Sequence, residues 1–152
     1  MKITIGFKPE EFERLLAIND ECYAGVERPT VDEFKHMLEC TDVFLAKEAI
    51  DRDPNNWRIL GFAIVRPSVG YGGKPYLWSI AVAKGSRGQG IGGGLLWKII
   101  EKYILMREKQ ISLHCNPDNP AQKLYFDQGF RVEGLAKNWY GTRHGLYMVR
   151  PL

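Results

Sequence analysis

Glycines are concentrated between Ala81 and Gly94, in the stretch AVAKGSRGQGIGGG, and their spacing could bind a phosphorylated ligand. Glycine has no Cβ, so it lets the backbone turn tightly and present its N–H groups to a ligand. The largely apolar segment Leu95–Ile100 predicts a following helix, whose first N–H groups and positive dipole end point at the same loop. A strand, a glycine-rich turn and a helix N-terminus in this order suit a pyrophosphate.

The glycine spacing separates several kinds of phosphate site. No Gly-Lys-Ser/Thr closes the turn, so it is not a P-loop. The dinucleotide pattern is met by Gly88, Gly90 and Gly93, but the acidic residue expected about 20 residues further on is missing. The pattern that fits is Arg-x-x-Gly-x-Gly, at Arg87, Gly90 and Gly92. The alternative is a glycine-rich connection that binds no ligand.

This pattern follows the predicted strand Tyr76–Ala83, begins the predicted helix Gly90–Glu108, and resembles motif A of the GNAT family of N-acetyltransferases. In that family the motif A loop holds the pyrophosphate of acetyl-coenzyme A. The resemblance therefore implies acetyl-coenzyme A as co-substrate. The loop residues implied to bind it are Arg87, Gly88, Gln89, Gly90, Ile91 and Gly92.

A second segment, Asp118–Phe130, resembles motif B of the same family, whose core is Asn-x-x-Ala-x-x-Leu-Tyr-x-x-x-Gly-Phe. The residues in step with this core are Ala121, Leu124, Tyr125, Gly129 and Phe130. The asparagine is out of step, because Asp118 stands in its place and Asn119 follows one residue later. Either residue could fill that position, and we place Asn119 in the cofactor-binding set.

The resemblance also implies how the thioester is handled. In GNAT enzymes the strand before motif A splays from its neighbour, which leaves backbone groups for the pantetheine arm; the matching residues are Ile80, Ala81 and Val82. A backbone N–H on this strand can polarise the thioester carbonyl. Tyr125 matches a tyrosine that protonates the departing thiolate in many members. Its alternative role is to pack the helix against the sheet.

The general base is less clearly marked. Many relatives carry a glutamate on the fourth strand, where this chain has Leu77–Ile80 and no carboxylate. On the fifth strand the nearest match is His114, whose ordinary pKa of about 6.5 suits a base acting directly or through water. Strand alternation also allows a packing or solvent-facing His114. Weaker candidates for approaching the acceptor are Glu21, Glu27 and His144.

Two kinds of acceptor amine fit the sequence. The segment Ile18–Tyr23 and the residues Asn138–Tyr140 resemble, weakly, parts of the ribosomal-protein alanine acetyltransferase type, which implies a protein N-terminus. An α-amine with a pKa near 8 is partly neutral at pH 7, whereas a lysine near 10.4 is almost fully charged. A small-molecule amine is the alternative, with the glycine-rich loop Pro67–Pro75 as a lid.

Hydrophobic patterning predicts an α/β (α+β) fold with about seven strands and about four helices, and the resemblance implies a mixed sheet that is splayed in the middle. The predicted order is β-α-α-β-β-β-α-β-α-β-β, which is the GNAT order. The predicted strands are Lys2–Phe7, Val43–Glu48, Ile59–Arg66, Tyr76–Ala83, Gln110–Asn116, Arg131–Tyr140 and Arg143–Arg150. Helices are predicted at Pro9–Asp20, from the Thr30–Glu33 capping box onward, at Gly90–Glu108 and in motif B.

Length and composition, with 45% apolar and 26% charged residues, predict one domain over residues 1–152, and the resemblance implies that it is an N-acetyltransferase domain. The net charge of +3 does not argue for nucleic acid, and no apolar run approaches a membrane span. The residues after Met1 read as a strand rather than a signal peptide. Three cysteines without CxxC spacing predict reduced thiols in the cytoplasm, and three scattered histidines predict no metal site.

The expected partners are therefore acetyl-coenzyme A and an amine acceptor, without membrane or nucleic acid, and homodimerisation stays open. Two readings from other classes compete with an enzyme. One is a non-catalytic acyl-coenzyme A binding module, which the missing carboxylate favours and Tyr125 argues against. The other is a nucleotide-binding or nucleic-acid-associated domain that uses Arg87 for phosphate, which no basic and aromatic stripe supports.

Overall fold

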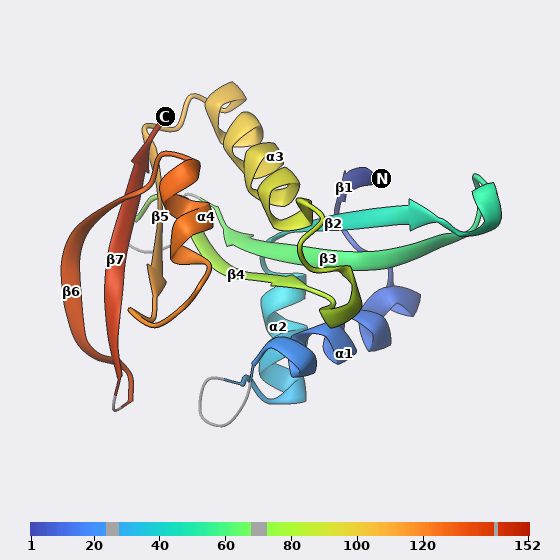
Figure 1. Cartoon of the computed structure of the whole chain (residues 1–152), viewed down its shortest axis with the longest axis horizontal. Coiled ribbons are helices and arrows are strands. Elements are labelled where there is room, and N and C mark those ends of the chain that lie inside the picture. Colours follow the sequence, from blue (N-terminus) through green and yellow to red (C-terminus); the bar gives the residue numbers. More distant parts are fainter. Residues whose placement is uncertain (24–27, 68–72, 142) are drawn as a thin grey trace.

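The computed structural model describes residues 1–152 apart from 24–27, 68–72 and 142. At its centre is a seven-stranded sheet in the order β1-β2-β3-β4-β5-β7-β6 (Figure 1). The strands are β1 Lys2–Ile5, β2 Asp42–Ala49, β3 Trp57–Arg66, β4 Tyr76–Val82, β5 Gln110–Cys115, β6 Arg131–Tyr140 and β7 Arg143–Pro151.

The sheet splits between β4 and β5. All other neighbouring strands are antiparallel, whereas β4 and β5 run parallel and pair at one position, Tyr76 with Ser112. Beyond this pair β4 continues beside β3 and β5 continues beside β7. The predicted mixed sheet, splayed in its middle, is confirmed, and the split opens the space for a site.

Helices cover both faces of the sheet (Figure 1). They are α1 Phe12–Cys22, α2 Val31–Glu39, α3 Ile91–Leu105 and α4 Gln122–Asp127. Residues of α1 and α2, including Leu15, Ile18 and Phe34, form one apolar core, and residues of α3 and α4 belong to a second. The predicted helix number and element order are confirmed.

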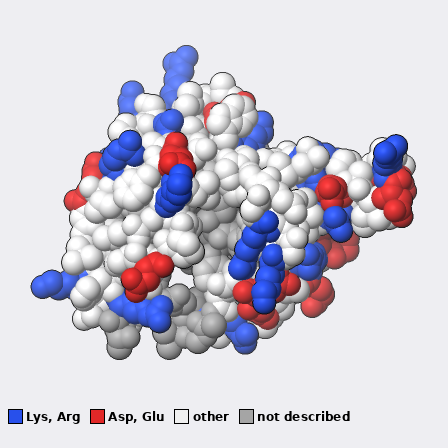
Figure 2. Space-filling view, in the orientation of Figure 1, with Lys and Arg blue, Asp and Glu red and all other residues white. Residues whose placement is uncertain are grey.

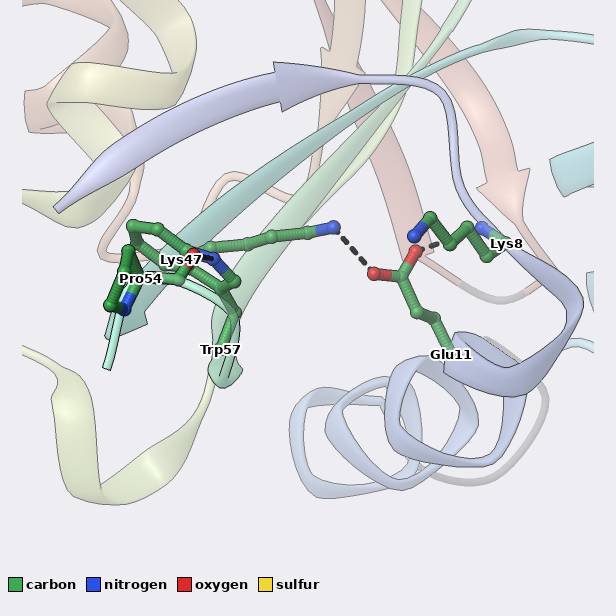
Figure 3. A network of polar contacts seen from close by, with 5 residues as sticks. All are labelled: Lys8, Glu11, Lys47, Pro54 and Trp57. Carbon is green, nitrogen blue, oxygen red and sulfur yellow. Dashed lines mark hydrogen bonds and ion pairs between the residues drawn. The ribbon is translucent and has the colours of Figure 1, made fainter. Parts of the chain in front are cut away.

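Side-chain contacts hold the start of α2 and the turn that precedes α1. Thr30 caps α2, because its hydroxyl accepts from the Glu33 N–H at 3.2 Å while the Glu33 carboxylate accepts from the Thr30 N–H at 2.7 Å. Glu11, just before α1, pairs with Lys47 of β2 and accepts from the Lys8 N–H at 2.8 Å (Figure 3). The first pair of contacts caps α2, and the second holds the turn before α1 against β2.

Some predicted boundaries differ from the observed ones. A 3-10 turn, Pro9–Glu11, precedes α1, which then extends to Cys22 rather than to Asp20. Helix α3 ends at Leu105 instead of Glu108, because Arg107 adopts a φ of +60°, which no α-helix continues through. Most of the predicted Pro67–Pro75 loop lies outside the described residues.

The surface carries charges of both signs. On the face shown in Figure 2, lysine and arginine alternate with aspartate and glutamate, and both signs gather at the tip of the β2–β3 hairpin, which carries Asp51, Arg52 and Asp53. In the described part of the chain, no helix is long and apolar enough to cross a membrane.

Candidate acetyl-transfer site

A cleft of about 520 Å³ opens where β4 and β5 diverge. Because β4 and β5 pair with each other at one position only, side chains from α1, β4, β5, α4 and β6 reach the space between them. The lining residues used below are Asn19 and Tyr23 at the end of α1, Tyr76 and Ile80 of β4, His114 of β5, Asn119 and Tyr125 around α4, and Trp139 and Tyr140 of β6.

His114 lies inside this cleft in a fixed position. Its Nδ1 is hydrogen-bonded to the Tyr76 hydroxyl at 3.0 Å, and its ring stacks on Trp139 with centroids 3.6 Å apart. The Tyr140 hydroxyl donates to the His114 backbone carbonyl at 2.8 Å. Burial lowers the pKa of His114 to about 4, so the ring is neutral at physiological pH.

Tyr125 reaches the same cleft from α4. Its side chain is 5% exposed and packs edge-on against Phe130, with ring centroids 5.9 Å apart. Burial raises the pKa of Tyr125 well above its ordinary value, and the neighbouring Tyr23 and Cys115 add to the effect. The hydroxyl therefore keeps its proton. The structure thus brings His114 and Tyr125 together in one cleft and also shows the packing role of Tyr125.

Backbone carbonyls of β4 already accept hydrogen bonds from side chains along the edge that faces the split. The Tyr23 hydroxyl donates to Ile80 O at 3.2 Å and bonds Ser79 Oγ at 2.9 Å. Arg87 Nε donates to Val82 O at 3.2 Å. Of the three predicted β4 residues, Ile80 lines the cleft, whereas Ala81 is buried in the α1–α2 core. This edge can offer N–H groups more readily than carbonyls.

The glycine-rich loop lies beyond the end of β4, outside the cleft lining. Gly88 and Gly90 have φ values of +75° and +76°, and a Cβ at either position would meet no protein atom within 4 Å. The first backbone hydrogen bond of α3 runs from Gly94 N–H to Gly90 O at 3.0 Å, so the preceding N–H groups have no partner within the helix. An open cradle of N–H groups results, which fits a pyrophosphate.

The other predicted loop residues differ in orientation. The Ile91 side chain is 2% exposed and belongs to the core, and Gly92 packs against Leu124, so both contribute backbone only. Gln89 is exposed. The Arg87 guanidinium folds back onto the end of β4, with Nη2 3.2 Å from Cys22 Sγ. Its predicted phosphate contact therefore requires this side chain to turn outward.

The structure distinguishes the two motif B candidates by position. Asn119 lines the cleft, and its Oδ1 accepts from the Ala121 N–H at 2.9 Å just ahead of α4. Asp118 is not part of the lining; its N–H donates to Asn116 Oδ1 at 3.0 Å. Of the two candidates, Asn119 is thus the one that lines the cleft, and its side chain holds the turn before α4.

The weaker base candidates are engaged elsewhere. The Glu21 carboxylate accepts from the Lys84 N–H at 2.9 Å, and His144 Nδ1 accepts from the Asn138 N–H at 3.0 Å. Glu27 lies outside the described residues. Among the residues that are described, no three His, Cys, Asp or Glu side chains gather as a metal ion would require.

Several residues of the cleft lining are not among the site residues predicted from the sequence, and they include Asn19, Tyr23 and Tyr76. Asn19 and Tyr23 lie in the segment Ile18–Tyr23, but nothing in its pattern says which side chains face inward. Tyr76 pairs with His114 across a gap of 38 positions in the chain. Only the splayed geometry of β4 and β5 brings that pair together, so no local signal could have found it.

Comparisons with known proteins agree with this geometry. The model of the acetyltransferase (GNAT) family matches residues 12–130. No curated protein sequence matches the chain. Three solved structures illustrate the range of similar folds.

The first is the NatC complex bound to Gag peptide and CoA, with a TM-score of 0.78, 19% identity, and 100% of this chain and 99% of that one covered. The second is the ribosomal-protein-alanine N-acetyltransferase of Brucella melitensis, with a TM-score of 0.76, 22% identity and full coverage of both chains. The third is nourseothricin acetyltransferase, with a TM-score of 0.60, 27% identity, and coverage of 74% and 65%. Because the family model spans most of the chain, the protein belongs to the acetyltransferase (GNAT) family.

Proposed function

We propose that this acetyltransferase moves the acetyl group of acetyl-coenzyme A to the α-amine of a protein N-terminus, by direct attack within a ternary complex. The observation that carries the proposal is the cleft at the split of β4 and β5, which holds a neutral Tyr76–His114 pair opposite the protonated Tyr125. Such a site can accept and return protons without a free carboxylate.

The open loop would hold the co-substrate. The N–H groups of Gly88–Gly92 would bind its pyrophosphate, with Arg87 turned outward, and the β4 edge at Ile80–Val82 would pair with the pantetheine arm. Asn119 faces the cleft beside this edge. Acetyl-coenzyme A supplies the acetyl group as a reactive thioester. The NatC structure contains CoA on a similar fold, which supports this assignment.

The cleft residues then manage charge and protons. Backbone N–H groups of β4 can donate to the thioester carbonyl as negative charge grows on its oxygen. The amine nitrogen bonds to the carbonyl carbon, the carbon–sulfur bond breaks, and Tyr125 donates its proton to the leaving sulfur. The proton lost by the amine passes to solvent, directly or through the Tyr76–His114 pair, and Tyr125 regains a proton from solvent before the next turnover.

A weak base in the cleft favours an acceptor that is easily deprotonated. His114, with a pKa near 4, holds a proton poorly and cannot efficiently deprotonate a lysine ammonium group near 10.4. An α-amine near 8 is partly neutral without help. Tyr23 on one side and Trp139 and Tyr140 on the other give the cleft aromatic walls, between which an extended peptide could enter.

The test is a panel of acceptors with acetyl-coenzyme A at pH 7.5. It should contain peptides with free N-termini, the same peptides blocked at the N-terminus but carrying lysine, polyamines and aminoglycosides. Thiol release measures turnover, and mass spectrometry of the product locates the acetyl group. We expect the free N-termini to react fastest. Faster reaction of the blocked lysine peptides would overturn the proposal.

A small-molecule amine is the second candidate. The observation in its favour is the likeness to nourseothricin acetyltransferase, at 27% identity over 74% of this chain. In the same panel, reaction confined to polyamines or aminoglycosides would establish this candidate and keep the enzyme class.

A further inference from the structure

The Asn19 side chain is a buried amide without a partner. Asn19 is 1% exposed and lines the cleft, and its Nδ2 is buried without a hydrogen bond. No hydrogen bond joins its side chain to any other residue that the structure describes. Buried polar side chains in folded proteins are nearly always hydrogen-bonded. The exception here lies where an acceptor would bind, so a ligand is a physical explanation for it.

Helix α1 holds this amide firmly. Asn19 follows the buried residues Leu15 and Ile18 on the face of α1 that packs on the sheet. Its backbone carbonyl accepts from the Tyr23 N–H at 3.0 Å, and the Tyr23 hydroxyl is tied to β4 through Ser79 Oγ at 2.9 Å. The backbone at Asn19 is therefore held in place, and the buried side chain that it carries lines the cleft.

A carboxamide recognises a particular arrangement of atoms. It presents one N–H donor group and one carbonyl acceptor side by side. A peptide N-terminus presents the complement, an amine with N–H donors and a carbonyl oxygen on the next carbon. A lysine side chain, a polyamine or a simple alkylamine has the amine but no adjacent carbonyl.

We propose that Asn19 binds the α-amino carbonyl unit of the acceptor through two hydrogen bonds. Its Oδ1 accepts a hydrogen bond from the amine, and its Nδ2 donates to the neighbouring carbonyl oxygen. The amine lone pair stays free to attack. This assignment rests on the proposed function for the location of the acceptor, and it names the acceptor class: amines with a carbonyl on the adjacent carbon, whether in peptides or in amino-acid amides.

The test compares two small amines of matched shape, alaninamide and 3-methylbutan-2-amine, the second of which has an isopropyl group in place of the carboxamide and so lacks the carbonyl. For each, kcat/KM is calculated for the neutral amine, so that the different amine pKa values cancel. The wild-type protein should prefer alaninamide by about tenfold or more, the usual effect of one buried hydrogen bond. Asn19→Leu should reduce that ratio by a similar factor.

Two further variants separate recognition from structure. Asn19→Asp keeps the shape and the acceptor atom but loses the donor, so it should also lower the ratio. Glu13→Leu makes a polar-to-leucine change on the exposed face of the same helix and should leave the ratio unchanged. Because the amide makes no bond within the described protein, Asn19→Leu should hold or raise the midpoint of thermal unfolding.

Each outcome bears on one of the two proposals. Equal losses on both amines, or a lowered unfolding midpoint with an unchanged ratio, would show Asn19 to be structural and overturn the inference. Inactive peptides together with an Asn19-dependent preference for alaninamide would refute the protein N-terminus and keep the inference. Acetylation of carbonyl-free amines alone would refute both.

Discussion

Burial acts in opposite directions on the two central side chains and leaves both uncharged. It lowers the pKa of His114 to about 4 and raises that of Tyr125 well above its ordinary value. A buried phenol that keeps its proton can give it to a thiolate as that group departs. Tyr125 is therefore expected to matter in the chemical step rather than in binding.

Tyr125→Phe removes the hydroxyl and keeps the ring contact with Phe130. Turnover should fall about 100-fold, the usual contribution of a general acid, with little change in the affinity for acetyl-coenzyme A. Steady-state kinetics and calorimetry measure the two quantities separately. Full turnover in a variant whose chemical step limits the rate would reduce Tyr125 to a packing residue.

The low pKa of His114 determines the pH–rate profile that we expect. Because its pKa is about 4, its protonation does not change between pH 6 and 9. A rise in kcat/KM over that range must then follow the amine of the acceptor, near 8 for a peptide N-terminus. The rise should shift with acceptors of different amine pKa and survive in His114→Gln. A limb near pH 6.5 that disappears in His114→Gln would contradict this.

The same pKa has a consequence for stability. Between pH 6.5 and about 4, His114 is protonated in the unfolded chain but neutral in the folded chain. Protonation of His114 therefore favours unfolding in this pH range. The stability that comes from keeping His114 neutral is fully present above pH 6.5. The free energy of unfolding then falls as the pH drops from 6.5 toward 4. Urea unfolding across this range should show a smaller loss for His114→Gln than for the wild type. Equal losses would mean that His114 titrates normally.

At the scale of elements, the turn between β4 and α3 must leave its N–H groups open. Gly90→Val should weaken acetyl-coenzyme A binding at least tenfold, because the new side chain enters space that no protein atom fills and that a phosphate needs. Its φ of +76° adds strain of about 1–2 kcal/mol, so folding must be checked by circular dichroism.

Gly85→Val is the matched control for this change. Gly85 is exposed, and its φ lies outside the left-handed region. A Cβ added at Gly85 would meet no protein atom within 4 Å, as at Gly90. The Gly85→Val protein should bind acetyl-coenzyme A with the affinity of the wild type, as measured by calorimetry. Unchanged affinity in a folded Gly90→Val protein would mean that the loop does not hold the pyrophosphate.

The elements were largely predictable from the sequence, whereas the contacts of the site were not. Thr30 and Glu33 encode the start of α2 locally, and the glycine pattern encodes the turn before α3. The end of α3 was predicted three residues too late because the left-handed backbone at Arg107 has no glycine to mark it. The Tyr76–His114 bond depends on how two strands diverge, which no single segment records.

At the scale of the whole molecule, the arrangement favours direct transfer over a covalent enzyme intermediate. An acetyl-cysteine route needs a reactive thiolate near both substrates. Burial raises the pKa of Cys115 to about 11. Cys40 is exposed at the end of α2, beside His36 of the cleft lining, but does not itself line the cleft. Cys22 lies against Arg87, but its thiol donates to Val82 O at 3.4 Å and does not line the cleft.

Initial rates at several fixed acceptor concentrations should therefore give intersecting double-reciprocal lines, as a ternary complex requires. Protein incubated with acetyl-coenzyme A alone should gain no acetyl group by mass spectrometry. Cys22→Ser should keep the intersecting pattern, since the serine hydroxyl can still donate to Val82 O. Parallel lines together with an acetylated cysteine would replace direct attack by a two-step route, because the acetyl group would then leave the thioester before the amine arrives.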